Sequence, residues 1–231
     1  MNRAWAFSLI AAAGCVDLKE AYPDFRYYSL EALRTGAERS GDTKAVLRVR
    51  RFSASQMCDG REMVTRTGET TYESDYYNAL FIPPAVQVGE LTRRWLQGSG
   101  IFGHVVGSGS SVAETQTLEG NLVALHGDYR NPDAPHAVIE VQFLLANVAA
   151  DPVSVQLQKT YREEVPFEKR TPASLVQGWD EGLRRILVAL EEDLAKGSLG
   201  LERRDSPPPP SARSARDRSG SAIRPENTKP Q

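Results

Sequence analysis

Three consecutive stretches of the chain, 122–129, 137–145 and 153–161, alternate between apolar and polar residues. In the middle stretch, Ile139 and Val141 would point to one side while their neighbours point to the other. A period of two is typical of strands that bury one face. Short connections rich in Asn, Asp and Pro separate the stretches, so they predict an antiparallel meander.

Shorter apolar runs predict further strands in the N-terminal half. These runs cover residues 27–30, 45–52, 61–66, 70–76 and 101–106. The third and fourth flank Thr67-Gly68-Glu69, a connection short enough for a hairpin with glycine in the turn.

Two segments have the 3.6-residue period of amphipathic helices instead. The first begins at Pro83-Pro84, carries Val88, Leu91 and Trp95 on one stripe, and is predicted to end near Gly98. The second is longer, with Thr171 as its cap and Gly197 as its predicted end. Its apolar stripe consists of Leu175, Val176, Trp179, Leu183, Ile186, Leu187, Leu190 and Leu194.

Together these elements predict one α/β (α+β) domain over residues 25–197. We expect a mostly antiparallel sheet packed by two main helices. The composition agrees, because 40% hydrophobic and 25% charged residues are typical of a globular chain that buries its own core.

The N-terminus has the layout of an export signal. Arg3 precedes a short uncharged apolar run that is too short to span a bilayer, and small residues end it. Ala12-Ala13-Gly14-Cys15 resembles a bacterial lipobox, which predicts a lipoprotein signal peptide at 1–14, lipid attachment at Cys15 and a tether at 15–24. The alternative, a buried first helix, is disfavoured because charged residues follow at once and the apolar period stops.

Residues 198–231 form a tail of different character. It contains an uninterrupted proline run at 207–210 and few apolar residues, which predicts disorder. From Arg203 onward it carries seven Lys or Arg against three Asp or Glu. Such a basic tail could bind anionic lipid or a cell-wall polymer, or it could be solvated without a partner.

Net charge and cysteine content exclude further classes of protein. Lys plus Arg number 28 against 30 Asp plus Glu, a formal net charge of -2, so no nucleic-acid partner is indicated. Only Cys15 and Cys58 are present, and Cys15 belongs to the export segment, so a disulfide framework is excluded.

No constellation of reactive residues predicts catalysis or a cofactor. The three histidines, His104, His126 and His136, lack metal-ligand spacing, and we expect them in loops or at strand edges. Cys58 lies in a turn-like stretch without the local signature of a nucleophile.

Two other features have simple structural interpretations. The glycine-rich run at 107–111 lacks the Lys-Ser or Lys-Thr of a phosphate loop, so we expect a flexible hairpin loop. The carboxylate clusters at 163–164 and 191–193 are expected on a solvated face. We therefore predict a protein that is not an enzyme and holds no metal or cofactor.

The middle of the chain resembles the ABC-type transport auxiliary lipoprotein family over about residues 25–196. The resemblance is carried by Asp-Tyr-Tyr-Asn at 75–78, the helix start at Pro83-Pro84, and the run 96–102 with Val105-Val106. Leu-Glu-Gly at 118–120, Gly-Asp-Tyr at 127–129 and Ala-Val-Ile-Glu at 137–140 add to it. The sequence departs from the family pattern near Leu80-Phe81, where a tryptophan is usual, and in its basic tail.

This resemblance implies a domain similar to the amino-terminal domain of the Tol-system propeller protein. It also implies a non-catalytic lipoprotein that accompanies an ABC ATPase, a permease and a mammalian-cell-entry-type lipid-binding protein. With Val16 rather than Asp after the cysteine, sorting would favour the outer membrane, facing the periplasm. The alternative is an envelope-structural lipoprotein that binds polymer or anionic lipid through its tail. A homo-oligomer would suit a docking role.

Overall fold

The computed structural model describes residues 24–202, with side chains described as far as residue 197. The signal peptide predicted at 1–14, Cys15, the tether up to residue 23 and the tail from residue 203 lie outside the described residues. The strands are β1 (Arg26–Tyr28), β2 (Asp42–Val49), β3 (Ser53–Ala54), β4 (Glu62–Arg66), β5 (Tyr72–Leu80), β6 (Phe102–Gly107), β7 (Gln116–Asp128), β8 (His136–Asn147) and β9 (Ser154–Pro166). The helices are the 3-10 turn η1 (Gln56–Cys58), α1 (Pro84–Gln97) and α2 (Pro172–Glu202).

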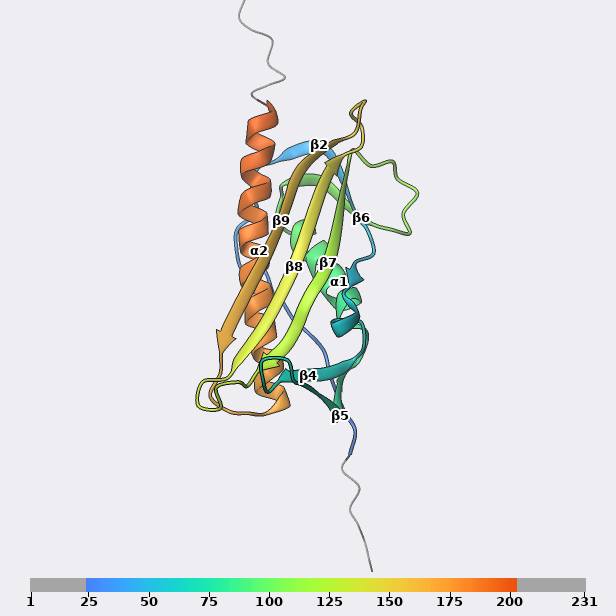
Figure 1. Cartoon of the computed structure of the whole chain (residues 1–231). Helices are drawn as coiled ribbons and strands as arrows, with labels where there is room; N and C mark the ends of the chain where they lie inside the picture. Colours follow the sequence, from blue (N-terminus) through green and yellow to red (C-terminus); the bar gives the residue numbers. More distant parts are fainter. Residues whose placement is uncertain (1–23, 203–231) are drawn as a thin grey trace, which may run out of the picture.

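The predicted meander forms the long part of the sheet. β7 pairs antiparallel with β8 along its whole length, and β8 pairs in the same way with β9 (Figure 1). The hairpin predicted across Thr67-Gly68-Glu69 in the N-terminal half is also confirmed, because β4 and β5 are antiparallel. The long pairings of this mixed sheet are therefore antiparallel, as the sequence predicts.

The other edge of β7 is shared by three short strands. β2, β3 and β4 follow one another along β7, and each runs parallel to it. β2 in turn pairs with β6, and β5 pairs with β1. Because these parallel pairings join segments far apart in the sequence, no local pattern predicts them.

Both helices pack on one face of the sheet and bury a single core. Phe52 and Phe143 meet between α1 and the sheet, with their ring centroids 5.8 Å apart. α2 approaches β8 at Gly178 and Gly182, where an added Cβ would lie 2.5 Å from the Ala137 Cβ and 2.7 Å from the Ile139 Cγ2. The fold class is thus a single α/β domain with a mixed, curled sheet and two helices.

Several predicted boundaries were wrong, among them the ends of β5 and β9, which run on to Leu80 and Pro166. β7 begins at Gln116 rather than residue 122, because its first half lacks a clean apolar alternation. The strand predicted at 45–52 ends at Val49, and the chain then bends so that Phe52 enters the core. α2 continues past Gly197 to Glu202, since nothing near Gly197 forces the left-handed turn that ends a helix.

The described chain begins and ends at opposite ends of the molecule. It starts beside β1 and β5 at the lower end, where α2 also begins (Figure 1). α2 then runs the length of the sheet to the upper end. At a rise of 1.5 Å per residue, a helix of this length spans roughly 46 Å.

Candidate functional site: the aromatic end of the domain

The histidines do not converge on a site. His104 is exposed on β6, and His136 is half-buried at the start of β8. His126 is buried in the interior of β7, which corrects the expectation that it lies in a loop or at a strand edge. Within residues 24–202, no three His, Cys, Asp or Glu side chains are grouped to hold a metal ion.

Cys58 is a buried core residue. Its thiol is 3.2 Å from the carbonyl oxygen of Leu122, to which it donates, and 3.1 Å from the Ser55 hydroxyl. Burial raises the pKa of the Cys58 thiol, so the nucleophilic thiolate is disfavoured. This environment suits packing rather than nucleophilic chemistry.

His126 lines a small hollow of about 160 Å³ on the face of the sheet away from the helices. The ring of Tyr72 packs edge-on against the imidazole ring of His126, and the two ring centroids are 5.7 Å apart. The Nε2 atom of His126 has no hydrogen-bond partner. Burial is the main cause that lowers the pKa of His126, and the positive charge of Arg162 lowers it further, so the imidazole stays neutral. Arg162 at the rim already binds Glu140 and Glu164, so its charge is satisfied within the protein.

The glycine-rich run after β6 presents carbonyl groups to a cation of the protein itself. The Arg48 guanidinium donates hydrogen bonds to the carbonyl oxygens of Gly107, Ser110 and Val112, and it binds the Glu114 carboxylate at 2.8 Å. A phosphate loop needs converging N–H groups instead. The run is therefore a connection held by Arg48 and does not form a phosphate site.

The sequence predicts that the carboxylates at 191–193 all lie on a solvated face of α2. The structure corrects this prediction for part of the cluster. Glu192 is exposed, but Glu191 is buried and accepts hydrogen bonds from Arg34, Arg39 and Trp95 at 2.7–2.9 Å. Burial raises the pKa of Glu191, but these three donors more than offset it, so the pKa lies below the usual range. Glu191 thus joins α1, α2 and the segment between β1 and β2.

The neighbouring Asp193 has a similar structural role. Its carboxylate binds Lys159 at 2.7 Å and accepts the hydroxyl hydrogen bond of Tyr161 at 2.9 Å. Burial and this hydrogen bond to a carboxylate both raise the pKa of Tyr161, so its hydroxyl stays protonated. These contacts fasten α2 to β9 and leave no free carboxylate pair for acid–base chemistry there.

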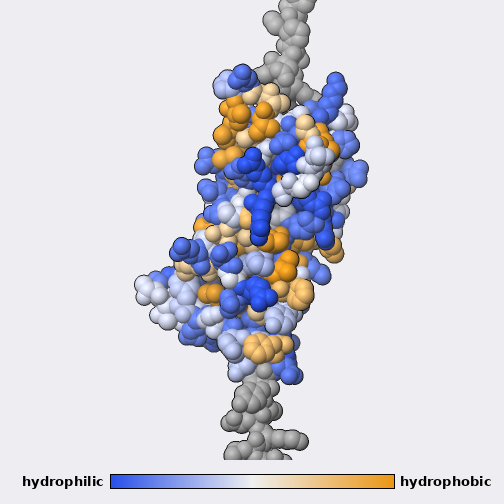
Figure 2. All heavy atoms as spheres, turned by 90° about the vertical axis from the view of Figure 1, so that its right-hand side faces the viewer, coloured by the Kyte–Doolittle hydropathy of each residue, from blue (hydrophilic) through white to orange (hydrophobic). Residues whose placement is uncertain are grey.

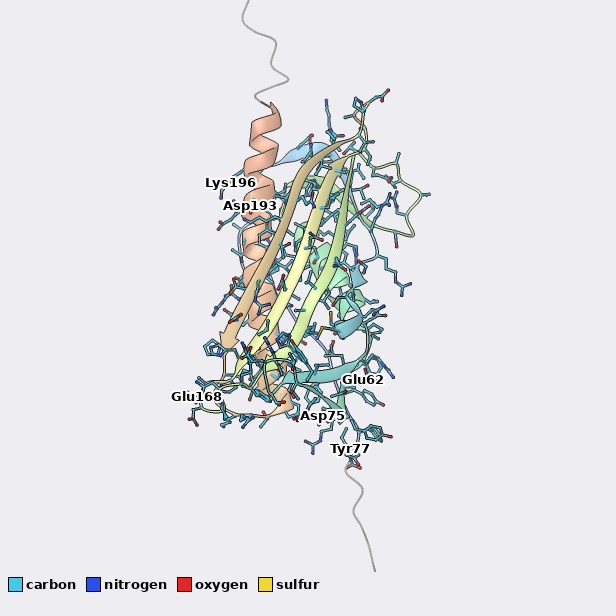
Figure 3. All side chains as sticks on the ribbon, in the orientation of Figure 1. Glu62, Asp75, Tyr77, Glu168, Asp193 and Lys196 are labelled. Atoms are coloured by element: carbon cyan, nitrogen blue, oxygen red, sulfur yellow. The ribbon has the colours of Figure 1, made fainter. Side chains whose placement is uncertain are left out.

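The most distinctive surface is a cluster of exposed aromatic rings where the described chain begins. It consists of Phe25, Tyr27, Tyr76, Tyr77 and Phe81, and we call it the aromatic end. Phe25 contacts both adjacent tyrosines, with centroid distances of 5.4 and 5.6 Å, and Tyr27 meets Phe81 at 6.2 Å. Figure 3 shows Tyr77 at the lower tip of the molecule.

A bulge in β5 pushes the two tyrosines outward. Glu62 and Met63 are neighbours on β4, yet they pair with Ala79 and Asp75 on β5, so Tyr76, Tyr77 and Asn78 are looped out. The Asp75 carboxylate holds the loop by accepting the N–H groups of both residues 77 and 78, at 2.9 and 3.0 Å. The exposure of these rings is therefore built into the backbone.

The aromatic end is largely open to solvent. Tyr76 is 74% exposed, Phe81 65%, and Phe25 and Tyr27 each 54%. Figure 2 shows a small hydrophobic group at the lower end, next to the start of the described chain and bordered by hydrophilic surface. The rings form two contacting groups, Phe25 with the two adjacent tyrosines and Tyr27 with Phe81, on paired strands. Exposed apolar groups gathered in this way can mark an interaction surface.

Sequence reasoning missed this surface although its signal was present. Five aromatic residues fall in two short segments, 25–27 and 76–81, that pair as β1 and β5. Without the parallel β1–β5 pairing, the two segments cannot be placed together. Cys15, the predicted lipid attachment residue, lies outside the described residues, about ten positions before the aromatic end.

No helix in the described part of the chain is both long and apolar enough to cross a membrane. Although α2 has the length, charged side chains such as Arg184, Arg185 and Glu192 lie on the faces outside its apolar stripe. Its apolar side is used for packing against β8 and β9.

Comparison with protein-family models and with curated protein sequences gave no match. Solved structures do match. The crystal structure of a Xanthomonas campestris protein assigned to family model DUF330 superposes with a TM-score of 0.62 at 14% identity, over 76% of this chain and 95% of that chain. A second crystal structure, of an uncharacterized protein, gives 0.58 at 17% identity, over 74% and 99%.

These matches define the class of the protein by fold alone. The chain shares its single α/β domain, with a mixed curled sheet and two helices, with the DUF330 structure. That structure is covered almost completely, so the shared unit is the whole domain rather than a fragment of it.

Proposed function

We propose that this protein is a non-catalytic accessory lipoprotein of an ABC-type lipid transport system in the bacterial envelope. Cys15 carries the acyl anchor, and the domain faces the periplasm from the outer membrane. There it docks a mammalian-cell-entry-type lipid-binding protein that works with ABC transporter subunits. The role needs a rigid, anchored contact surface and no reaction centre.

One observation carries the proposal. A lipobox-like segment at 12–15 lies directly ahead of a single folded domain whose described reactive side chains do not converge. The buried thiol of Cys58, the neutral His126 and the internally paired Glu191 each have a structural explanation. The family resemblance of residues 75–106 and 118–140 supplies the transport context.

The experiment is affinity purification of the full-length protein from detergent-solubilised envelopes, with co-purifying proteins identified by mass spectrometry. The matched control is Cys15→Ala, which removes the only thiol that the lipobox offers for acylation. For the unmodified protein we expect an acylated mass, outer-membrane density, and recovery of a mammalian-cell-entry-type protein with ABC subunits.

Each part of the proposal can fail separately. An unmodified mass at Cys15, with membrane partitioning unchanged in Cys15→Ala, would contradict the anchor. Recovery of cell-wall-associated proteins alone would favour the structural lipoprotein, with the basic tail as its binding segment. Recovery of no partner, at a stringency that keeps other envelope complexes intact, would contradict the docking role.

A further inference from the structure

We propose that the aromatic end is a membrane-contact surface that inserts into the bilayer interface and sets the orientation of the domain. The occupant is the headgroup region of a phospholipid bilayer. The inference rests on the proposed lipid anchor for the placement of this end near the membrane. The contact itself depends only on described residues.

The chain geometry places the aromatic end beside the anchor. The described residues begin at Asp24, and Phe25 already belongs to the cluster. An acylated Cys15 would lie about ten residues upstream, and even a fully extended segment of that length reaches only about 30–35 Å. The aromatic end is thus the part of the domain that the anchor holds closest to the bilayer.

The chemistry of the cluster suits the interface rather than the hydrocarbon core. Three tyrosines and two phenylalanines present apolar rings together with phenolic hydroxyl groups. Tyrosine is enriched at membrane–water interfaces because its ring prefers the acyl boundary while its hydroxyl stays hydrated. A protein core or a tight dimer interface would instead bury these hydroxyl groups and require partners for them.

The charges around the cluster indicate that the rings drive the contact. Arg26 on β1 lies near it, and so does Arg61, whose guanidinium donates to the Phe81 carbonyl oxygen. Acidic residues lie near it as well, namely Asp24 just before β1, Glu62 on β4 and Asp75 on β5. The Asp75 carboxylate is occupied by the N–H groups of the bulge. With both signs present, we expect binding to neutral and anionic bilayers alike, with little dependence on salt.

The remainder of the surface near the start of the chain offers a matched control. Leu33 is 75% exposed, so it is as accessible as any ring of the cluster. It lies beyond β1, near Arg34, whose guanidinium binds Glu191 at the other half of α2. Replacing Leu33 therefore removes a comparable exposed apolar side chain without touching the aromatic end.

The first experiment tests binding without the anchor. The mature chain from residue 16, which lacks leader and acyl groups, is floated with phosphatidylcholine vesicles and with vesicles that also contain phosphatidylglycerol. Phe25→Ser/Phe81→Ser should lower the partition coefficient roughly tenfold or more on both, because two exposed rings no longer transfer into the interface. Leu33→Ser should bind as the unmodified chain does.

The second experiment tests orientation in the acylated full-length protein. An environment-sensitive fluorophore is attached to Tyr76→Cys, or to Val153→Cys at the opposite end of the sheet. After reconstitution into vesicles, emission at position 76 should shift to the blue and be quenched by brominated lipid. Emission at position 153 should remain that of a probe in water.

The outcomes separate this inference from the proposed function. Vesicle binding that Phe25→Ser/Phe81→Ser leaves unchanged, or that Leu33→Ser reduces equally, would overturn the membrane contact. So would a water-exposed probe at position 76 while the acylated protein stays on vesicles. Sedimentation that shows a dimer dissociated by Phe25→Ser/Phe81→Ser, without lipid, would assign the surface to a second copy instead. Thermal unfolding of each variant checks that the fold is retained.

Discussion

Glu191 is the residue on which three parts of the molecule depend. The residue is 5% exposed, and its carboxylate accepts hydrogen bonds from Arg34, Arg39 and Trp95. Breaking a buried ion pair costs more than the pair contributes, because the partner charge stays buried without compensation. The hydrogen bond of Trp95 is lost at the same time.

We therefore expect Glu191→Ala to lower the free energy of unfolding by roughly 3 kcal/mol or more. The adjacent exposed Glu192 gives the control, since Glu192→Ala should change it by less than about 0.5 kcal/mol. Urea unfolding followed by far-ultraviolet circular dichroism measures both. Equal, small effects would show that the Arg34–Glu191 pair does not hold the domain together.

Asp180 is a half-buried acid, and no cationic side chain in the described part of the chain pairs with it. It accepts the backbone N–H of Glu31 at 2.8 Å, and burial raises its pKa to about 6. Its ordinary pKa is 3.8. Between these values the folded state binds more protons than the unfolded state, so this group makes the protein more stable as the pH falls from 6 toward 4.

The substitution Asp180→Asn should remove the charge and keep an oxygen acceptor for Glu31. We expect it to stabilise the protein above pH 6 by about 1 kcal/mol, allowing for the partial contact of Asp180 with water. That corresponds to a rise in Tm of about 2–4 °C. Thermal unfolding from pH 4 to pH 8 should show the gain shrinking toward pH 4, whereas Asp133→Asn, at an exposed loop residue, should show none.

At the scale of elements, the glycines of α2 have opposite roles. Gly178 lets the helix approach β8, and an added Cβ would lie 2.5 Å from the Ala137 Cβ. Gly197 has open space around it, with no atom within 4 Å. The same substitution should therefore change stability in opposite directions at the two positions.

Gly178→Ala should destabilise the domain by about 1–3 kcal/mol, because α2 must move away from the sheet. Gly197→Ala should stabilise it by about 0.5–1 kcal/mol through its higher helix propensity. Chemical denaturation of the two variants beside the parent chain measures this. A stabilising Gly178→Ala would mean that α2 does not pack tightly on β8.

The sequence predicts those elements whose pattern is local. The alternation in β8 and the helical stripe of α2 are each complete within one segment, and both were confirmed. β9 was also confirmed as a strand, but Val153 and Val155 of its predicted apolar face are exposed. The first half of β7 was missed because Glu119, Gly120 and Asn121 interrupt the alternation.

The parallel pairing of β1 with β5, which forms the aromatic end, cannot be predicted from the sequence of either segment alone. Glu191 and Glu192 look alike as a pair of acids. Only the helical phase, which puts Glu191 on the same stripe as Leu187 and Leu194, distinguishes the buried one.

At the scale of the whole molecule, two candidate membrane contacts adjoin opposite ends of the described chain. One is the aromatic end, and the other is the basic tail that follows α2. β1 lies at the aromatic end, whereas α2 ends at the opposite end, roughly 46 Å away along the helix axis (Figure 1). A segment that follows α2 therefore starts far from the surface that the anchor would hold near the bilayer.

Deleting residues 203–231 should leave binding to neutral vesicles unchanged, because that binding depends on Phe25 and Phe81. Flotation of the mature chain with and without these residues measures it. Loss of binding on deletion, confined to vesicles that contain phosphatidylglycerol, would show that the basic residues of this segment carry a lipid contact of their own.

β2, β3 and β4 all pair along one edge of β7, and this arrangement affects the order in which the chain folds. β7, β8, β9 and α2 are contiguous and joined by short connections, so their contacts close small loops. β2 and β4, by contrast, reach β7 only across long sequence separations, which slow pairing. Pulsed hydrogen exchange should therefore protect amides of β8 before those of β2. If the chain is exported N-terminus first, as the proposed function requires, β2 and β4 would emerge before β7. Their hydrogen-bonding edges would then stay unpaired, and accessible to chaperones, until β7 arrives.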